Sequence, residues 1–136
     1  MYTSTVKIIG GREGKVISSD GHLDINLSKP KELGGPGGNG TNPEQLFAAG
    51  YGACFDGAIN VAARNKRIKI GTTELNTSVT IHKDDETGFY LSVVMKAHIP
   101  GVSVEVAKEL IQDAHQICPY SKSIRGNVEV ELKVVY

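Results

Sequence analysis

The chain of 136 residues contains no tryptophan, only two cysteines (Cys54 and Cys118), and no net charge, because 15 basic residues balance 15 acidic ones. The zero balance argues against a general nucleic-acid binder and against a polybasic protein of membrane surfaces. No apolar run approaches the ~20 residues of a membrane span. The first five residues lack the basic and apolar segments of a signal peptide. We therefore expect a cytoplasmic protein without nucleic-acid or membrane partners.

Two cysteines in a chain without a secretory signal are not expected to form a structural disulfide. Hydrophobic residues make up 40% of the chain and charged residues 22%, which is ordinary for a globular protein. A chain of this length can bury roughly two-thirds of its unfolded surface. We find no repeat or linker, and we expect one domain over residues 1–136.

Apolar and polar residues alternate in several short segments, which is typical of strands with one buried face. Three such segments lie in the first thirty residues, and Asp20-Gly21 predicts a two-residue hairpin turn between the second and the third. Residues 30–40 are too rich in glycine and proline for a regular element. A longer hairpin is predicted over residues 75–99, and a last strand over residues 128–134.

Two helices are predicted between these strands. The first runs from about Pro43 to Lys66, with Asn42 as its N-cap and Gln45 placed to close a capping box. Its middle consists largely of alanine and glycine, which indicates a buried helix approached closely by neighbouring backbone. The second helix follows the N-cap Ser103, carries one apolar stripe, and ends before Pro119.

The predicted order is therefore β-β-β-α-β-β-α-β. Hairpins dominate, so we expect a mainly antiparallel sheet with two packed helices, which is an α+β fold.

Two short motifs have simpler explanations than a ligand site. The segment 35–40 matches G-x-G-x-x-G, but no buried strand leads into it and no acidic residue ends a second strand about twenty positions on. A flexible lead-in to a helix explains it better than a dinucleotide site. His115 and Cys118 form H-x-x-C without the further ligands that a metal site needs. We expect no metal and no cofactor, and a solvated or packed His115.

Four residues together contain the parts of a thiol site, although each has a plain structural explanation. Cys54 and Cys118 can both be core residues. Arg12 lies in a glycine-rich turn and can be solvated, and Glu44 can simply favour a helix N-terminus. As a set they offer a nucleophile, a second thiol to resolve an oxidised product, a cation to favour a thiolate, and a carboxylate to orient that cation. Spacing along the sequence does not decide whether they meet.

Three segments carry a resemblance to a known family. Residues 40–51 with 53–55, GTNPEQLFAAGY and ACF, resemble the first-cysteine motif of organic hydroperoxide resistance proteins. Residues 118–121 with 125–128, CPYS and RGNV, resemble the second-cysteine motif, and residues 10–14 resemble the N-terminal arginine turn. The similarity spans the chain and points to the Ohr branch of the OsmC/Ohr family. Gly52 and Lys122 depart from the pattern, in which Ala and Asn are expected.

The resemblance implies a thiol peroxidase that reduces organic hydroperoxides to alcohols. Cys54 would be the peroxidatic cysteine, Cys118 the resolving cysteine, and Arg12 and Glu44 their supporting pair. It also implies an intertwined homodimer in which both protomers build each site, and a dithiol reductant carried by a lipoylated protein. Arg12 is then expected to lower the pKa of Cys54.

Two other functions remain open at this point. One is an OsmC-type peroxidase of broader substrate range. The other is a non-enzymatic redox sensor or binder of a hydrophobic ligand. The chain carries no DNA-binding segment that could transmit a signal, which counts against a sensor.

Overall fold

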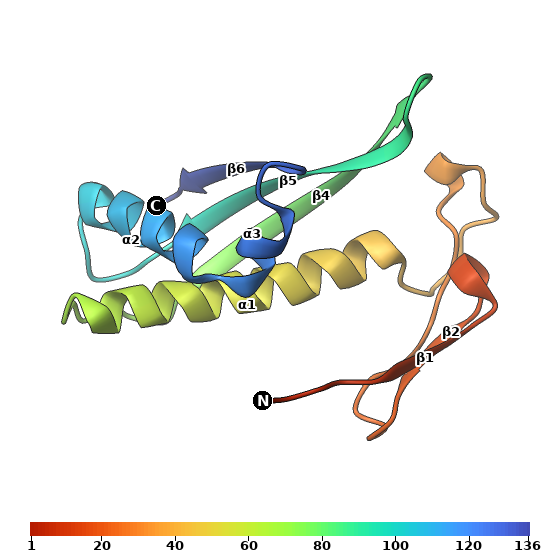
Figure 1. Cartoon of the computed structure of the whole chain (residues 1–136), viewed down its shortest axis with the longest axis horizontal. Helices are drawn as coiled ribbons and strands as arrows, with labels where there is room; N and C mark the ends of the chain where they lie inside the picture. Colours follow the sequence, from red (N-terminus) through yellow and green to blue (C-terminus); the bar gives the residue numbers. More distant parts are fainter. The chain divides into compact units, whose positions relative to one another are not determined.

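A computed structural model describes all 136 residues and has an α+β architecture (Figure 1). Two compact units divide the chain, Met1–Leu46 and Phe47–Tyr136. The prediction of a single domain over the whole chain stays a prediction. The expected single sheet is instead two sheets of three strands, with one sheet in each unit.

The sheet of the first unit is antiparallel, in the order β1-β2-β3. Its strands are β1 (Val6–Ile9), β2 (Lys15–Ser18) and β3 (Asp24–Asn26). The alternating patterns had predicted all three. Val16, in the middle strand, is the one buried strand residue of this sheet, so the sheet carries only a small core of its own.

The turn before β3 differs from the predicted two-residue hairpin. The N–H of Ser18 donates to the carbonyl of Leu23 at 2.7 Å, which leaves four residues in the loop. The Asp20 carboxylate accepts from the Ser18 hydroxyl at 2.6 Å and from the His22 N–H at 3.0 Å. An aspartate that bonds to its own turn in this way stabilises a longer loop than the Asp-Gly pair alone predicts. The loop before α1 also contains a short 3-10 helix, Lys31–Leu33, where no regular element was predicted.

The long helix α1 spans Pro43–Asn65, one residue short of the predicted end. Asn42 caps it as predicted, because its side-chain oxygen accepts from the Gln45 N–H at 2.8 Å. The predicted capping box is not closed. The Gln45 side chain instead accepts a hydrogen bond from the Thr41 hydroxyl at 2.7 Å.

The sheet of the second unit has the order β4-β5-β6. Strands β4 (Glu74–Asp84) and β5 (Gly88–His98) form the predicted antiparallel hairpin. Strand β6 (Glu129–Val134) pairs with β5 in parallel, because the chain crosses over through helices before it returns.

Helix α2 spans Val104–Ile117 and begins, as predicted, after the N-cap Ser103, whose hydroxyl accepts from the Val106 N–H. A third helix, α3 (Pro119–Ile124), was not predicted. Pro119 does mark the end of α2, but a proline also suits the first position of a new helix, since it has no N–H to leave unpaired. Cys118 has extended backbone angles and separates the two helices.

The core of the second unit lies between α1, the sheet and α2. Figure 1 shows α1 running alongside the β4-β5-β6 sheet. Seven residues of α1 are buried, including Tyr51, Phe55 and Ile59. By length and mean hydropathy α1 would also qualify as a membrane span, but a core helix passes the same test.

Candidate active site

A tight turn between β1 and β2 presents Arg12 from a short 3-10 helix, Gly11–Glu13. Gly10 has a φ of 73°, a left-handed conformation that glycine adopts without strain. At Gly14 a side chain is excluded, because a Cβ would lie 1.7 Å from the Ile9 carbonyl oxygen. The backbone of this turn therefore requires glycine at these two positions. Arg12 lies between them, and its side chain projects from the turn.

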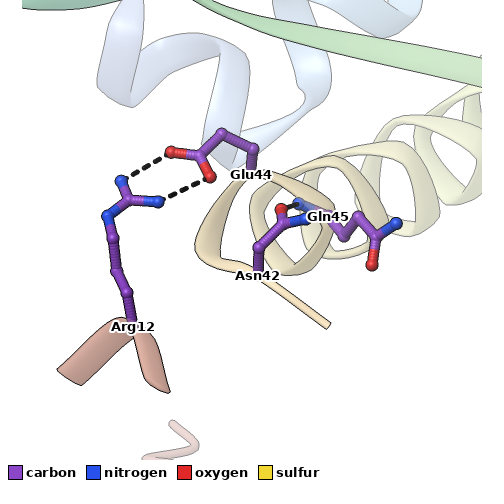
Figure 2. Close-up of polar contacts among 4 residues, drawn as sticks. All are labelled: Arg12, Asn42, Glu44 and Gln45. Carbon is purple, nitrogen blue, oxygen red and sulfur yellow. Dashed lines mark hydrogen bonds and ion pairs between the residues drawn. The ribbon is translucent and has the colours of Figure 1, made fainter. Parts of the chain in front are cut away.

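Arg12 and Glu44 form a two-pronged ion pair, which Figure 2 shows at the start of α1. The guanidinium Nη1 donates to Oε2 of Glu44 at 2.9 Å, and Nη2 donates to Oε1 at 2.7 Å. This fork-to-fork geometry is specific to arginine. The pair joins residues that are 32 positions apart, which the sequence alone did not establish.

The ion pair shifts the pKa of both residues. The hydrogen bonds from Arg12 hold the pKa of Glu44 below its usual 4.5, with a smaller opposing effect from burial. The same contact raises the pKa of Arg12. The Glu44 side chain is 14% exposed and that of Arg12 35% exposed, so the cation keeps an accessible face while the carboxylate is largely covered.

In the second unit the two cysteines lie side by side as free thiols. Cys54 comes from the middle of α1, and Cys118 from the junction of α2 and α3. The Cys118 thiol donates to the sulfur of Cys54 at 3.5 Å, although the residues are 64 positions apart. A disulfide bond is about 2.05 Å long, so a small approach of the two sulfur atoms would suffice for bonding.

The surroundings of Cys54 within its unit oppose ionisation. Burial is the largest effect and raises the pKa of Cys54, and the adjacent Cys118 sulfur raises it further. The Tyr120 backbone has a smaller influence that lowers it. All of these groups belong to the second unit, and the expectation that Arg12 lowers the pKa of Cys54 stays a prediction.

The predicted residues thus fall into two pairs. Arg12 and Glu44 meet within the first unit, and Cys54 and Cys118 meet within the second.

Three further residues beside the thiols were not predicted as functional. The Ser121 hydroxyl lies 2.7 Å from the Tyr51 hydroxyl and 2.9 Å from Nδ1 of His115. The sequence offered one indirect signal, the H-x-x-C spacing of His115 and Cys118. His115 is packed, as one alternative had it, with its ring centroid 6.3 Å from that of Phe55. No group of three or more histidine, cysteine, aspartate or glutamate side chains is arranged to hold a metal ion.

Comparison with known proteins adds family information to this geometry. Residues 35–133 match the family model described as OsmC-like protein. The chain is 47% identical over 133 residues to an organic hydroperoxide resistance protein of Xanthomonas axonopodis pv. citri, covering 97% of this chain and 93% of the relative. It is 45% identical to the organic hydroperoxide resistance protein OhrA of Bacillus subtilis, covering 98% and 96% of the two chains.

A solved structure also resembles this fold closely. A crystal structure from Legionella pneumophila, described as an organic hydroperoxide resistance protein OsmC, superposes with a TM-score of 0.95 at 46% identity. The match covers 100% of this chain and 98% of that one.

Proposed function

Because the chain belongs to the OsmC-like family, in its organic hydroperoxide resistance branch, we propose that it is a thiol-dependent peroxidase reducing organic hydroperoxides to alcohols. The observation that carries this proposal is the 3.5 Å separation of two free thiols from distant parts of the chain. Two thiols at this distance can exchange between dithiol and disulfide without refolding, which a peroxidase of this chemistry needs in every cycle.

The first step is the attack of the Cys54 thiolate on the outer oxygen of the hydroperoxide. A sulfur–oxygen bond forms, the O–O bond breaks, and the leaving alkoxide takes up a proton to become the alcohol. Cys54 is left as a sulfenic acid. Cys54 is assigned this role because it is the partly exposed thiol, whereas Cys118 is fully buried.

In the second step the sulfur of Cys118 attacks the sulfur of the Cys54 sulfenic acid. The S–S bond forms, the S–O bond breaks, and the hydroxyl leaves as water with the proton of the Cys118 thiol. An external dithiol then reduces the disulfide by exchange. We propose a dihydrolipoyl group on a lipoylated protein as this reductant.

Arg12 is proposed to promote the first step. The neighbours of Cys54 raise its pKa, so formation of the thiolate needs a nearby positive charge. Arg12 is a permanent cation with an accessible face, and Glu44 fixes its orientation through two hydrogen bonds. The same guanidinium can stabilise the negative charge that develops on the peroxide oxygen in the transition state.

The surroundings of the thiols support an organic substrate rather than hydrogen peroxide. Cys54 packs against the apolar core of its unit, and Cys118 is part of that core. An apolar wall favours a hydroperoxide with a bulky hydrocarbon group, because burying that group contributes about 25 cal/mol for each Å².

We propose a homodimer as the working form, with both protomers contributing to each site. Supporting this, Ala49, Ala53 and Gly57 lie at intervals of four on α1 and are exposed within the chain. Small residues at this spacing let another backbone approach the helix closely.

A single-turnover experiment tests the assignment of the two cysteines. Reduced protein receives one equivalent of cumene hydroperoxide, and peroxide loss and protein mass are followed. We expect Cys118→Ser to consume the equivalent and to keep a sulfenic acid on Cys54. Cys54→Ser should consume none. If instead Cys54→Ser consumes the peroxide and Cys118→Ser does not, the roles are reversed.

The same reaction, repeated with an added dithiol and with hydrogen peroxide, separates the alternative peroxidase and sensor functions. A redox sensor would be oxidised once but would not turn over when a dithiol is supplied. A peroxidase of the broader OsmC type would reduce hydrogen peroxide about as fast as cumene hydroperoxide.

A further inference from the structure

One buried hydroxyl joins three helices next to the thiols. Ser121, on α3, is fully buried. Its oxygen lies 2.7 Å from the hydroxyl of Tyr51 on α1 and 2.9 Å from Nδ1 of His115 on α2. Tyr51 is itself fully buried, so water does not compete for this contact.

The three groups can satisfy one another in one chain of hydrogen bonds. A serine hydroxyl has one proton to donate and two lone pairs to accept with. With His115 neutral and its proton on Nε2, Ser121 donates to Nδ1 of His115 and accepts from the Tyr51 hydroxyl. Removing Ser121 leaves the buried Tyr51 hydroxyl unpaired, which is more costly than the net value of one hydrogen bond. Removing the Tyr51 hydroxyl or His115 takes away one of the two hydrogen bonds that hold Ser121.

This cluster lies on the segment that carries the second thiol. Cys118 directly precedes α3, and Ser121 follows it within the first helical turn. Between them, Tyr120 stacks on the ring of Tyr51 with centroids 5.9 Å apart. Helix α3 has only six residues, so its position depends on these contacts more than on its own stability.

We propose that Ser121, held by Tyr51 and His115, is a positioning residue for the resolving step. It keeps the start of α3 in place, so that the Cys118 sulfur stays within reach of Cys54. The step it serves is the condensation of the Cys54 sulfenic acid with the Cys118 thiol, which yields the disulfide and water. This inference rests on the proposed function and assigns part of the same site.

The test measures two rates in one reaction. Reduced protein is mixed with one equivalent of cumene hydroperoxide, and samples are quenched at short times with an alkylating agent. Peroxide loss reports the first step, and loss of the alkylatable Cys118 thiol reports disulfide formation, because the Cys54 thiol is already oxidised in the first step. For Ser121→Ala we expect disulfide formation to slow about tenfold, and at least fivefold more than peroxide consumption.

A second readout is the fate of the sulfenic acid under excess peroxide. When resolution is slow, further oxidation competes, so a larger fraction of Cys54 should reach the sulfinic acid, with two added oxygens by mass. A general loss of stability would slow both steps together and would not shift this partition.

Matched variants separate the hydrogen bonds from the bulk of the side chains. Tyr51→Phe keeps the stacked ring and removes only the hydroxyl, so it should slow disulfide formation as Ser121→Ala does. His115→Leu removes the acceptor, whereas His115→Asn retains one near Nδ1 and should restore the rate. Ser123→Ala is the control, because that hydroxyl, on the same helix, bonds only to the Pro119 carbonyl.

The experiment distinguishes a failure of the proposed function from a failure of the positioning role of Ser121. If wild type neither consumes the hydroperoxide nor forms the disulfide, the proposed function is wrong. If wild type does both, and Tyr51→Phe and Ser121→Ala leave the ratio of the two rates unchanged, this inference alone is overturned. An equal slowing in Ser123→Ala would also overturn it. Should Ser121→Ala not fold, Tyr51→Phe decides the matter.

Discussion

Replacing Arg12 with lysine keeps the positive charge and removes the planar fork. In the structure two guanidinium nitrogens contact the two oxygens of Glu44, at 2.9 and 2.7 Å. A lysine ammonium is a compact charge at the end of a flexible chain, and it cannot reproduce this paired geometry. Arg12→Lys should therefore retain one of the two hydrogen bonds and lose the fixed orientation of the cation.

The size of the effect follows from the exposure of the pair. A hydrogen bond between charged groups contributes roughly 1.5–3 kcal/mol when well shielded. The Arg12 side chain is 35% exposed, so solvent screening reduces the loss to about 1 kcal/mol. If this orientation serves the transition state of the first step, peroxide reduction should slow about fivefold.

The assay is the rate of Cys54 oxidation by cumene hydroperoxide in rapid mixing, with wild type, Arg12→Lys, Glu44→Gln and the double variant. If the pair acts as a unit, the effects of the two single changes should not add. Asp24→Asn serves as the control, because it breaks the exposed ion pair with Lys15 in the same unit.

Two results would refute the reasoning. One is an Arg12→Lys variant that reacts within twofold of wild type over the whole pH range. The other is a double variant whose loss equals the product of the two single losses, since that would mean that Glu44 does not act through Arg12.

Three other predictions concern the reductant, the core and pH. Dihydrolipoamide should support rapid turnover and glutathione should not; efficient turnover with glutathione alone would contradict the lipoyl proposal. Gly52→Ala should lower the free energy of unfolding measured in urea, because the new Cβ would lie 2.6 Å from Thr77 Oγ1. In a Thr77→Ala background the same change should raise the free energy of unfolding by up to about 1 kcal/mol, since alanine favours a helix more than glycine does. A change of the same sign in both backgrounds would exclude the clash. Burial, followed by the charge of Arg125, lowers the pKa of His115 below 6.5, so protonation favours the unfolded chain and stability falls as pH drops from near neutrality through the folded pKa. His115→Asn should flatten this decline between about pH 7 and pH 5, and identical slopes for both proteins would disprove it.

Local sequence patterns predicted most of the secondary structure. Alternation located all six strands, and capping residues located the starts of α1 and α2. The errors lie where a local signal has two meanings. Pro119 can end one helix or begin another, and here it does both. Asp20-Gly21 can form a two-residue turn, but the hydrogen bonds of the Asp20 side chain stabilise a longer loop.

The residues of the proposed site were also predicted from the sequence, because a thiol site needs a particular set of groups and motifs from a known family carry them. The contacts between these residues could not be predicted from the sequence. The contacts between Arg12 and Glu44 and between Cys54 and Cys118 join positions 32 and 64 residues apart, and such separations leave no periodic trace.

What the sequence by itself determined is the set of elements and the chemistry available to them, since alternation, caps and glycine-rich turns act over a few neighbouring residues. Only the tertiary structure decided the electrostatics and the polar cluster. It brought Cys54 into an apolar setting that raises its pKa, and it enclosed the Ser121 hydroxyl between Tyr51 and His115. Burial and hydrogen bonding depend on what packs around a group, and the helices that surround these groups come from distant parts of the chain.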